Sequence, residues 1–124
     1  MSTLIFGASD LGTAAGVVYL PPGFSPGAKG NAIAVTVPED GTLSQLHVRH
    51  NSPIGPGTEV ITYTVRVNGS DTDLSASLAA DTANSRNQEE AVDVVEGDRV
   101  EVVADKGTGL TESALDAVVS MDLS

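Results

Sequence analysis

The sequence predicts an all-β protein built as an antiparallel β-sandwich, and three observations support this fold class. Short apolar runs alternate with period two, so that one side chain faces a core and the next faces water. Thirteen Gly and six Pro interrupt the chain at short intervals, and with no Trp, two Phe and two Tyr the core must consist of smaller apolar side chains. No long helical pattern separates the strands, which argues against a parallel βαβ sheet.

The first part of the chain, residues 1–31, is the least regular. Residues 2–6 and 17–20 could form short strands, but several glycines and a Pro-Pro pair at residues 21–22 interrupt the region. A Pro-Pro pair does not fit a central strand. We therefore predict an irregular, extended N-terminal arm over residues 1–31 that leads into a β-sandwich domain over residues 32–124.

Regular alternation begins with a predicted strand at residues 32–37 and continues in a longer one at residues 42–50. In the longer strand Leu43 is out of phase with Leu46 and Val48. One extra residue in one strand of a pair, a β-bulge, would bring Leu43 back onto the same face as Leu46 and Val48. The pattern therefore predicts a β-bulge or a shared edge in this strand.

The region from residue 60 to residue 78 gives the clearest hairpin signal. Every second residue from Ile61 to Val67 is apolar, and a second alternating run follows the turn. Between them, Asn68-Gly69 supplies the two positive-φ residues that a tight hairpin turn requires.

The rest of the chain continues the same pattern. Residues 79–86 are predicted to be a connection with at most one helical turn, and strands are predicted at residues 87–94, 99–104 and 114–123. The total is eight or nine strands with short turns between them, a spacing typical of a sandwich or barrel.

The chain is strongly acidic, with 17 Asp and Glu, 6 Lys and Arg, and a net charge of −11. Such a surface repels nucleic acid and anionic membranes, so we expect neither as a partner. The acidity fits a salt-adapted protein or an acidic mesophilic protein, and both alternatives stay open. The absence of Cys excludes disulfides and thiolate chemistry. The first residues lack the basic and apolar regions of a signal peptide.

No pattern in the sequence predicts an enzyme. The segment Gly23-Phe24-Ser25-Pro26-Gly27 matches the letters of a nucleophile elbow. The residue after the serine is proline, however, which has no N–H to offer an oxyanion hole. We therefore expect a Pro/Gly turn here, no catalytic residue and no cofactor, and a small hydrolase ranks lowest among the candidate functions.

The candidate metal ligands also fail to form a recognisable site. His47 and His50 lie three apart on a strand and therefore point to opposite faces, and His50 is in phase with the apolar residues. We predict that His50 is a hydrogen-bonded histidine at the strand end. Asp71, Asp73 and the acidic group at residues 89–98 lack the full calcium-loop pattern. We expect no metal site, although calcium binding by these acidic loops remains an open alternative.

Residues 92–102, Val-Asp-Val-Val-Glu-Gly-Asp-Arg-Val-Glu-Val, resemble the late strand pair of trimeric jelly rolls of the tumour-necrosis-factor and complement type. The strand at residues 42–50 and the hairpin at residues 60–78 are similar to the middle of that fold. The resemblance covers residues 32–123 at the level of strand order. It implies a jelly roll that assembles as a homotrimer.

A disulfide-free jelly roll with an irregular arm and no active site also resembles the decoration (cement) proteins of tailed viruses. This resemblance implies a non-enzymatic virion protein that is made in the host cytoplasm and binds the major capsid protein on the capsid surface. It further implies that the apolar arm residues contact the partner: Leu4, Ile5, Phe6, Tyr19, Leu20 and Phe24. The alternative for these residues is packing against their own domain. The alternative function is a receptor- or glycan-binding head of a spike, tail or fibre.

Overall fold

The computed structural model of the chain describes residues 2–12, 15–26, 30, 33–55, 60–107, 110 and 115–124. All regular secondary structure in these residues is β-strand, which confirms the predicted all-β class. No helix in the described residues is long and apolar enough to cross a membrane. The eleven strands found in this part of the chain are β1 (Ser2–Ser9), β2 (Gly16–Leu20), β3 (Ser25–Pro26), β4 (Val35–Thr36), β5 (Gly41–His50), β6 (Ile61–Val67), β7 (Ser70–Leu78), β8 (Asn84–Asn87), β9 (Val92–Val94), β10 (Arg99–Lys106) and β11 (Ala117–Leu123).

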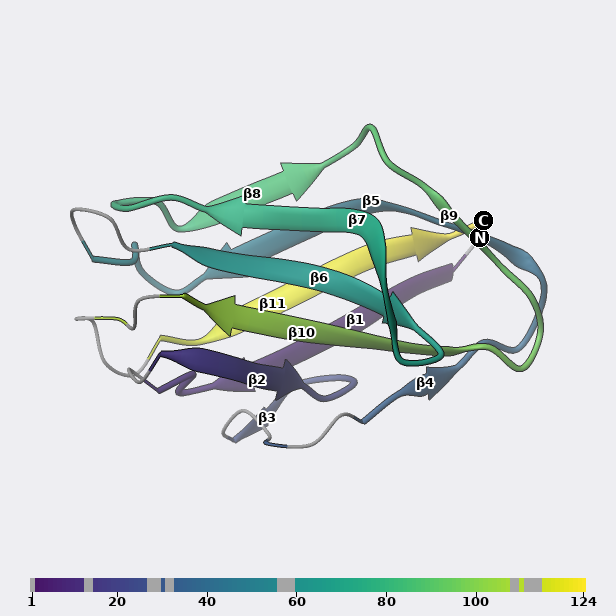
Figure 1. Cartoon of the computed structure of the whole chain (residues 1–124), viewed down its shortest axis with the longest axis horizontal. Helices are drawn as coiled ribbons and strands as arrows, with labels where there is room; N and C mark the ends of the chain where they lie inside the picture. Colours follow the sequence, from purple (N-terminus) through teal and green to yellow (C-terminus); the bar gives the residue numbers. More distant parts are fainter. Residues whose placement is uncertain are drawn as a thin grey trace.

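The strands form two sheets that lie face to face (Figure 1). Sheet A has the order β3-β1-β11-β5-β8, with β9 also paired to β5, and sheet B has the order β2-β10-β6-β7, with β4 paired to β10. The chain crosses from one sheet to the other between β1 and β2, β5 and β6, β7 and β8, and β10 and β11, whereas β6 and β7 form a hairpin within sheet B. Strands distant in sequence therefore become neighbours, as in a jelly roll. The predicted antiparallel sandwich with jelly-roll topology is confirmed.

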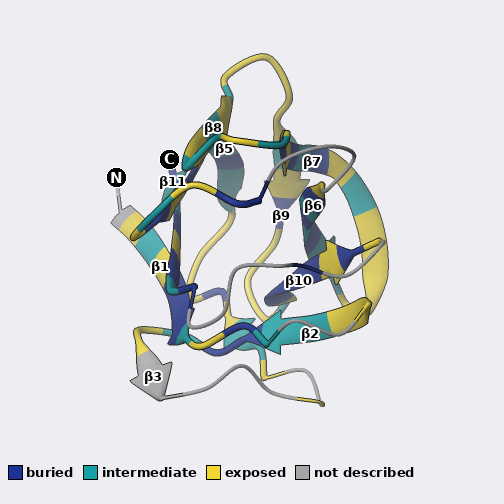
Figure 2. Cartoon of the chain, turned by 90° about the vertical axis from the view of Figure 1, so that its left-hand side faces the viewer, coloured by how far each residue is buried: buried dark blue, intermediate teal, exposed yellow. Residues whose placement is uncertain are grey.

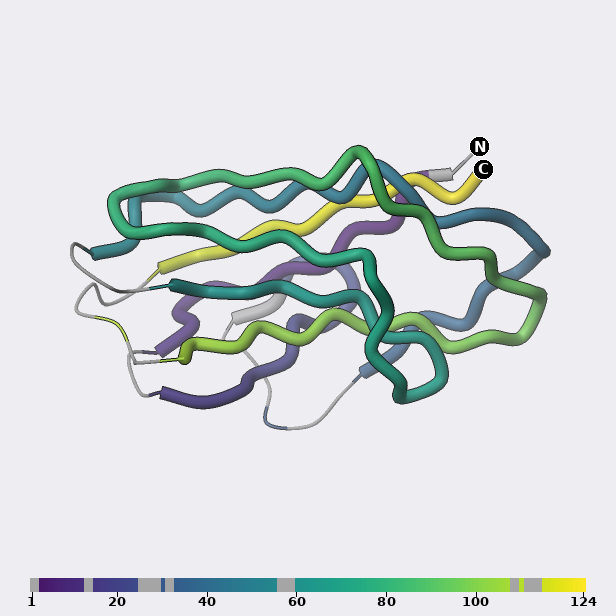
Figure 3. Tube along the Cα trace, turned by 45° about the horizontal axis from the view of Figure 1, so that its top comes forward, coloured from purple at the N-terminus to yellow at the C-terminus, as the bar shows by residue number. Residues whose placement is uncertain are grey.

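The first two strands are integral parts of the sandwich. Strand β1 pairs with β11 from Ser2 opposite Leu123 to Ala8 opposite Ala117, and β2 pairs with β10 along its whole length. The two ends of the chain thus run side by side (Figure 3). The predicted arm over residues 1–31 is therefore wrong for the described residues of that range.

A glycine explains why this region looked irregular in sequence. A Cβ atom added at Gly7 would lie 2.9 Å from the Ala117 carbonyl oxygen and 2.9 Å from Phe24 Cδ2. Glycine inside a strand often marks such a close approach of another segment. Gly7 therefore allows β11 and the segment around Phe24 to pack closely against β1.

The core lies between the inward faces of the two sheets, where Figure 2 shows the buried residues. Tyr63 and Phe6 are its largest fully buried side chains, the next largest are Leu, Ile and Met, and Val and Ala complete the core. Burying one such side chain stabilises the fold by about 1.5–3 kcal/mol. A core with few aromatic side chains therefore depends on many modest contributions from both sheets.

Strand β5 contains the predicted bulge. Its register against β11 shifts between Ser120 and Asp122, where β5 carries one residue more than β11, and Gln45 adopts a φ of 55°. The extra residue turns both Leu43 and Leu46 into the core, although they are three positions apart. The expected bulge is thus confirmed.

The β6–β7 hairpin forms as predicted. Asn68 and Gly69 make the turn with φ values of 53° and 83°, the positive angles that a two-residue hairpin loop requires. On the β7 side the register shifts again, and Thr72 Oγ1 donates a hydrogen bond of 2.7 Å to the Val65 carbonyl oxygen at this irregularity.

The region after this hairpin differs from expectation. Residues 79–86 were expected to be a connection with at most one helical turn, but β8 begins at Asn84 and pairs with β5. The expected strand at residues 87–94 is in fact divided between the end of β8 and the short β9. The sequence Asn-Ser-Arg-Asn of β8 contains no apolar residue, so its strand character leaves no periodic signal.

We predict that Phe6→Ala lowers the free energy of unfolding by about 3–5 kcal/mol, because Phe6 is completely buried. The neighbouring substitution Ile5→Ala should cost at most about 0.5 kcal/mol, because Ile5 is an exposed side chain of the same strand. Urea unfolding followed by circular dichroism measures both. Equal, small effects of the two substitutions would show that β1 is not part of the folded core.

Candidate functional site: the outer face of sheet A

Three exposed apolar side chains gather on the outer face of sheet A. Phe6 and Ala8 of β1 point into the core, so Ile5 points outward on the other side of the strand. Ile5, Phe24 and Val118 keep 48%, 56% and 41% of their surface exposed. We call these three residues the apolar patch.

Local geometry holds the apolar patch together. The Gly23 amide donates a hydrogen bond of 2.8 Å to the Ile5 carbonyl oxygen, which fixes the segment before Phe24 against β1. The ring of Phe24 lies over Gly7, where no side chain intervenes. Gly7 is in turn the register partner of Val118 on β11. The patch therefore spans β1, β11 and the residue that precedes β3.

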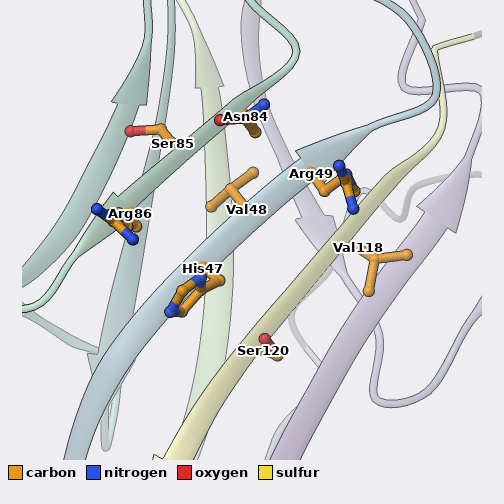
Figure 4. Close-up of a pocket in the computed structure, with 8 residues that line it drawn as sticks. All are labelled: His47, Val48, Arg49, Asn84, Ser85, Arg86, Val118 and Ser120. Carbon is orange, nitrogen blue, oxygen red and sulfur yellow. The ribbon is translucent and has the colours of Figure 1, made fainter.

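A group of basic residues lies on the same face, and we call its members, His47, Arg49 and Arg86, the basic cluster. His47 and Arg49 lie on β5, and Arg86 of β8 is the register partner of His47. All three are exposed. They line a shallow hollow of about 770 Å³. Figure 4 shows β5 in the middle of this hollow, with Arg86 on one side and Val118 and Ser120 of β11 on the other.

Arg49 and Arg86 form no ion pair within the described part of the chain, and Arg86 also lines a second hollow together with Glu89 and Glu90. The hollow of the basic cluster is lined, besides the three cluster residues, only by apolar and neutral polar residues: Val48, Asn84, Ser85, Val118 and Ser120. Among the described residues, Arg66 is the only cation that forms ion pairs. Neither Arg49 nor Arg86 forms an ion pair with a described residue. This is a local concentration of positive charge on a chain with a net charge of −11.

The apolar patch and the basic cluster form one continuous surface. Val118 is the register partner of Arg49, so the two outward side chains are direct cross-strand neighbours. Likewise, Ser120 lies between His47 on β5 and Ile5 on β1. The outer face of sheet A therefore changes from apolar at the β1 side to basic at the β8 side without a break.

An acidic segment follows directly at the edge of this face. Glu89 and Glu90 come after β8, are exposed, and line a second hollow beside β7 and β8. The Asn87 side-chain oxygen accepts hydrogen bonds from both of their amides, at 3.1 and 3.0 Å, which fixes the backbone of this turn. We call Glu89 and Glu90 the acidic edge.

The outer face of sheet B is different in character. Arg66 of β6 lies between two carboxylates, with Nε 3.1 Å from Asp71 Oδ1 and 3.8 Å from Glu101 Oε1. Its Nη2 also donates to the Gly69 carbonyl oxygen at 2.7 Å. The charge of Arg66 is therefore balanced locally, whereas the exposed Arg99 of β10 in the same sheet forms no ion pair among the described residues.

One buried polar pair lies inside the sandwich. The Nε2 atom of His50 and the hydroxyl oxygen of Tyr63 are 2.6 Å apart, and both residues are buried. Burial lowers the pKa of His50 to about 4 and raises the pKa of Tyr63. The predictions that His50 is a hydrogen-bonded histidine and that His47 points to the opposite face are confirmed. This pair links β5 of one sheet to β6 of the other.

The other candidate motifs do not assemble into a reactive site in the described residues. No group of three or more His, Asp or Glu side chains there is placed to hold a metal ion. Ser25 and Pro26 of the elbow-like motif form the short edge strand β3 beside β1, rather than a turn into a helix. Asp71 pairs with Arg66 and is otherwise exposed to solvent.

The six residues expected to form a docking arm are divided among three environments. Phe6 and Leu20 are completely buried, and Leu4 packs against the core. Tyr19 lies on sheet B, where Arg66 Nη1 donates to its hydroxyl at 3.4 Å. The expected joint docking surface is therefore corrected: Ile5 and Phe24 are the members on the outer face of sheet A.

Sequence reasoning missed the remaining members of this surface for identifiable reasons. Val118 is an apolar residue at a position where the alternation of its strand predicts an exposed side chain. This exception to the pattern could have identified it from the sequence. Arg49 occupies an ordinary outward position, and Arg86 lies in a segment without apolar periodicity. Their meeting depends on the pairing of β5 with β8, which no local pattern reveals.

No family model matches the chain, and no curated protein sequence matches it. Among solved structures, the crystal structure of murine APRIL at pH 8.5 is similar, with 12% sequence identity and a TM-score of 0.48. The match covers 98% of this chain and 100% of the APRIL chain. The jelly roll of this chain follows from its own strand order, and the expected resemblance to tumour-necrosis-factor-type trimers stays a prediction. The expected resemblance to decoration proteins stays a prediction.

The buried histidine predicts a defined pH dependence. The unfolded chain protonates His50 near pH 6.5, whereas the folded chain resists protonation until about pH 4. The unfolded state therefore binds more protons between these values, and stability falls as the pH drops through this window. The expected loss from His50 is up to about 3 kcal/mol, with no contribution above about pH 7.

Denaturant unfolding between pH 4 and pH 7 measures this effect. The substitution His50→Gln keeps a hydrogen-bonding group near Tyr63 but cannot titrate, so its pH dependence should be flatter than that of the unmodified protein. His47→Gln, on the exposed side of β5, is the matched control. An unchanged slope in His50→Gln would contradict the assignment.

Proposed function

We propose that the chain is a non-enzymatic structural protein of a virus particle, a capsid decoration protein that binds the major capsid protein as a homotrimer. The observation that carries this proposal is the outer face of sheet A. It combines an exposed apolar patch with unpaired positive charge on an otherwise acidic molecule. Contiguous exposed apolar surface is typical of protein–protein contact sites.

In this proposal the apolar patch contacts the capsid lattice. Ile5, Phe24 and Val118 lie on or beside paired strands, so their positions are fixed before binding and little conformational freedom is lost. Each side chain that docks contributes on the order of 1–3 kcal/mol. Three copies that bind together would turn such weak contacts into firm attachment through high effective concentration.

The alternative function is a receptor- or glycan-binding head of a spike, tail or fibre. The hollow lined by Arg49, Arg86 and Asn84 favours it, because guanidinium and amide groups bind anionic sugars. The hollow's lining contains no aromatic side chain on which a sugar ring could stack. A glycan array separates the two functions, since a decoration protein should bind no glycan.

The proposal predicts the effect of removing the apolar patch. The double substitution Ile5→Ser/Phe24→Ser should weaken binding to capsids of the encoding virus by roughly tenfold to a hundredfold per residue, because apolar contact area is lost. The matched control is Val17→Ser/Val95→Ser, which changes two residues that are 49% and 57% exposed and are not members of the apolar patch. Co-sedimentation of labelled protein with purified capsids measures the affinity.

Unmodified protein that does not co-sediment with capsids would contradict the proposed function. Equal losses in the two double variants would instead show that binding occurs without the apolar patch. Far-ultraviolet circular dichroism of both variants checks that the sandwich remains intact.

A further inference from the structure

We propose that the basic cluster of one copy receives the acidic edge of a second copy, so that Arg49 and Arg86 pair with Glu89 and Glu90 across the contact. The inference rests on the homotrimer of the proposed function and names the surfaces that would form it. It uses the β8 side of the outer face of sheet A, whereas the apolar patch lies at the β1 side.

The first argument is charge complementarity. Arg49 and Arg86 are exposed and lack an ion-pair partner among the described residues, although the chain carries 17 acidic side chains. Glu89 and Glu90 are likewise exposed and form none of the ion pairs within the described part of the chain. Arg86 lines the second hollow together with Glu89 and Glu90, but it forms no ion pair with either of them, so both guanidinium groups and both carboxylates can pair with a second molecule.

The second argument concerns the fixed positions of these groups. The guanidinium-bearing residues lie on paired strands, and the acidic edge is held by the two hydrogen bonds to Asn87. An arginine can bind a carboxylate through two parallel hydrogen bonds. Because these bonds require a defined geometry, backbone positions that are fixed before binding favour them. Val118 adjoins Arg49 and would exclude water from one side of the contact.

The third argument concerns symmetry. A twofold contact that set the two basic clusters directly against each other would be repulsive. The basic cluster therefore needs the acidic edge as its counterpart. A twofold contact in which each cluster meets the other copy's edge satisfies this requirement, and so does a head-to-tail contact that closes into a ring. The trimer of the proposed function corresponds to the ring.

Other occupants fit less well. Nucleic acid is disfavoured by the net charge of −11. A sugar would find no aromatic ring in the lining of the hollow. An acidic surface of protein remains the best match, and the chain itself supplies one at the adjoining edge.

Sedimentation velocity at low ionic strength tests the inference. The unmodified chain should sediment as a trimer. Arg49→Glu/Arg86→Glu should weaken assembly on the order of a hundredfold and yield monomers, because two attractive pairs become repulsive. The matched control Arg99→Glu changes an exposed arginine outside the basic cluster and should leave the trimer intact.

The opposite reversal provides a sharper variant. Glu89→Arg/Glu90→Arg should also yield monomers, although it lowers the net negative charge and would favour association if general repulsion were decisive. The combined fourfold variant has the original net charge and should form trimers again. Far-ultraviolet circular dichroism checks that each variant is folded. If one of the two charge reversals does not fold, the other alone tests the inference.

Unmodified protein that stays monomeric would overturn the inference, as would trimers that survive both charge reversals or a fourfold variant that stays monomeric. These results are distinguishable from failure of the proposed function. Trimers that respond to charge as expected but ignore capsids would overturn the decoration role alone. Monomers that bind capsids would overturn the contact between copies alone.

Discussion

The antiparallel ladder between β1 and β11 is the constraint on which the rest of this structure depends. It joins the two ends of the chain in the middle of sheet A and places β11 between β1 and β5. The inward side of this ladder supplies Phe6, Val119 and Met121 to the core. Without the ladder, sheet A would lose β1 and β3, and the core would lose one of its two largest buried side chains.

The same ladder also creates the candidate site. Because successive side chains alternate across a strand, the residues between the core positions form the outer face. Gly7 removes a side chain from that face and allows Phe24 to lie against it, next to Val118. The strand pairing that buries the core thus also brings apolar and basic groups together on one surface. On sheet B, Arg66 is paired with Asp71 and Glu101, whereas Arg49 and Arg86 on sheet A form no ion pair among the described residues.

Local signals in the sequence predicted the parts of the fold that local chemistry determines. The β6–β7 hairpin follows from period-two alternation and an Asn-Gly turn, and the bulge in β5 follows from the phase of Leu43. The pairing of β1 with β11 and of β5 with β8 joins segments far apart in the chain, so no local pattern contains it. Ile5 and Phe24 could be expected in the site because they are apolar residues of the N-terminal region. Arg49 and Arg86 could not, because they come together through the pairing of β5 with β8.

The most direct test of this account is an electron cryomicroscopy map of virus particles that carry the protein. The account predicts trimers whose outer face of sheet A is covered, by the capsid at Ile5 and Phe24 and by the next copy at Arg49 and Arg86. The outer face of sheet B should then remain open to solvent. A map in which the outer face of sheet A is open to solvent while the outer face of sheet B makes the contacts would contradict it.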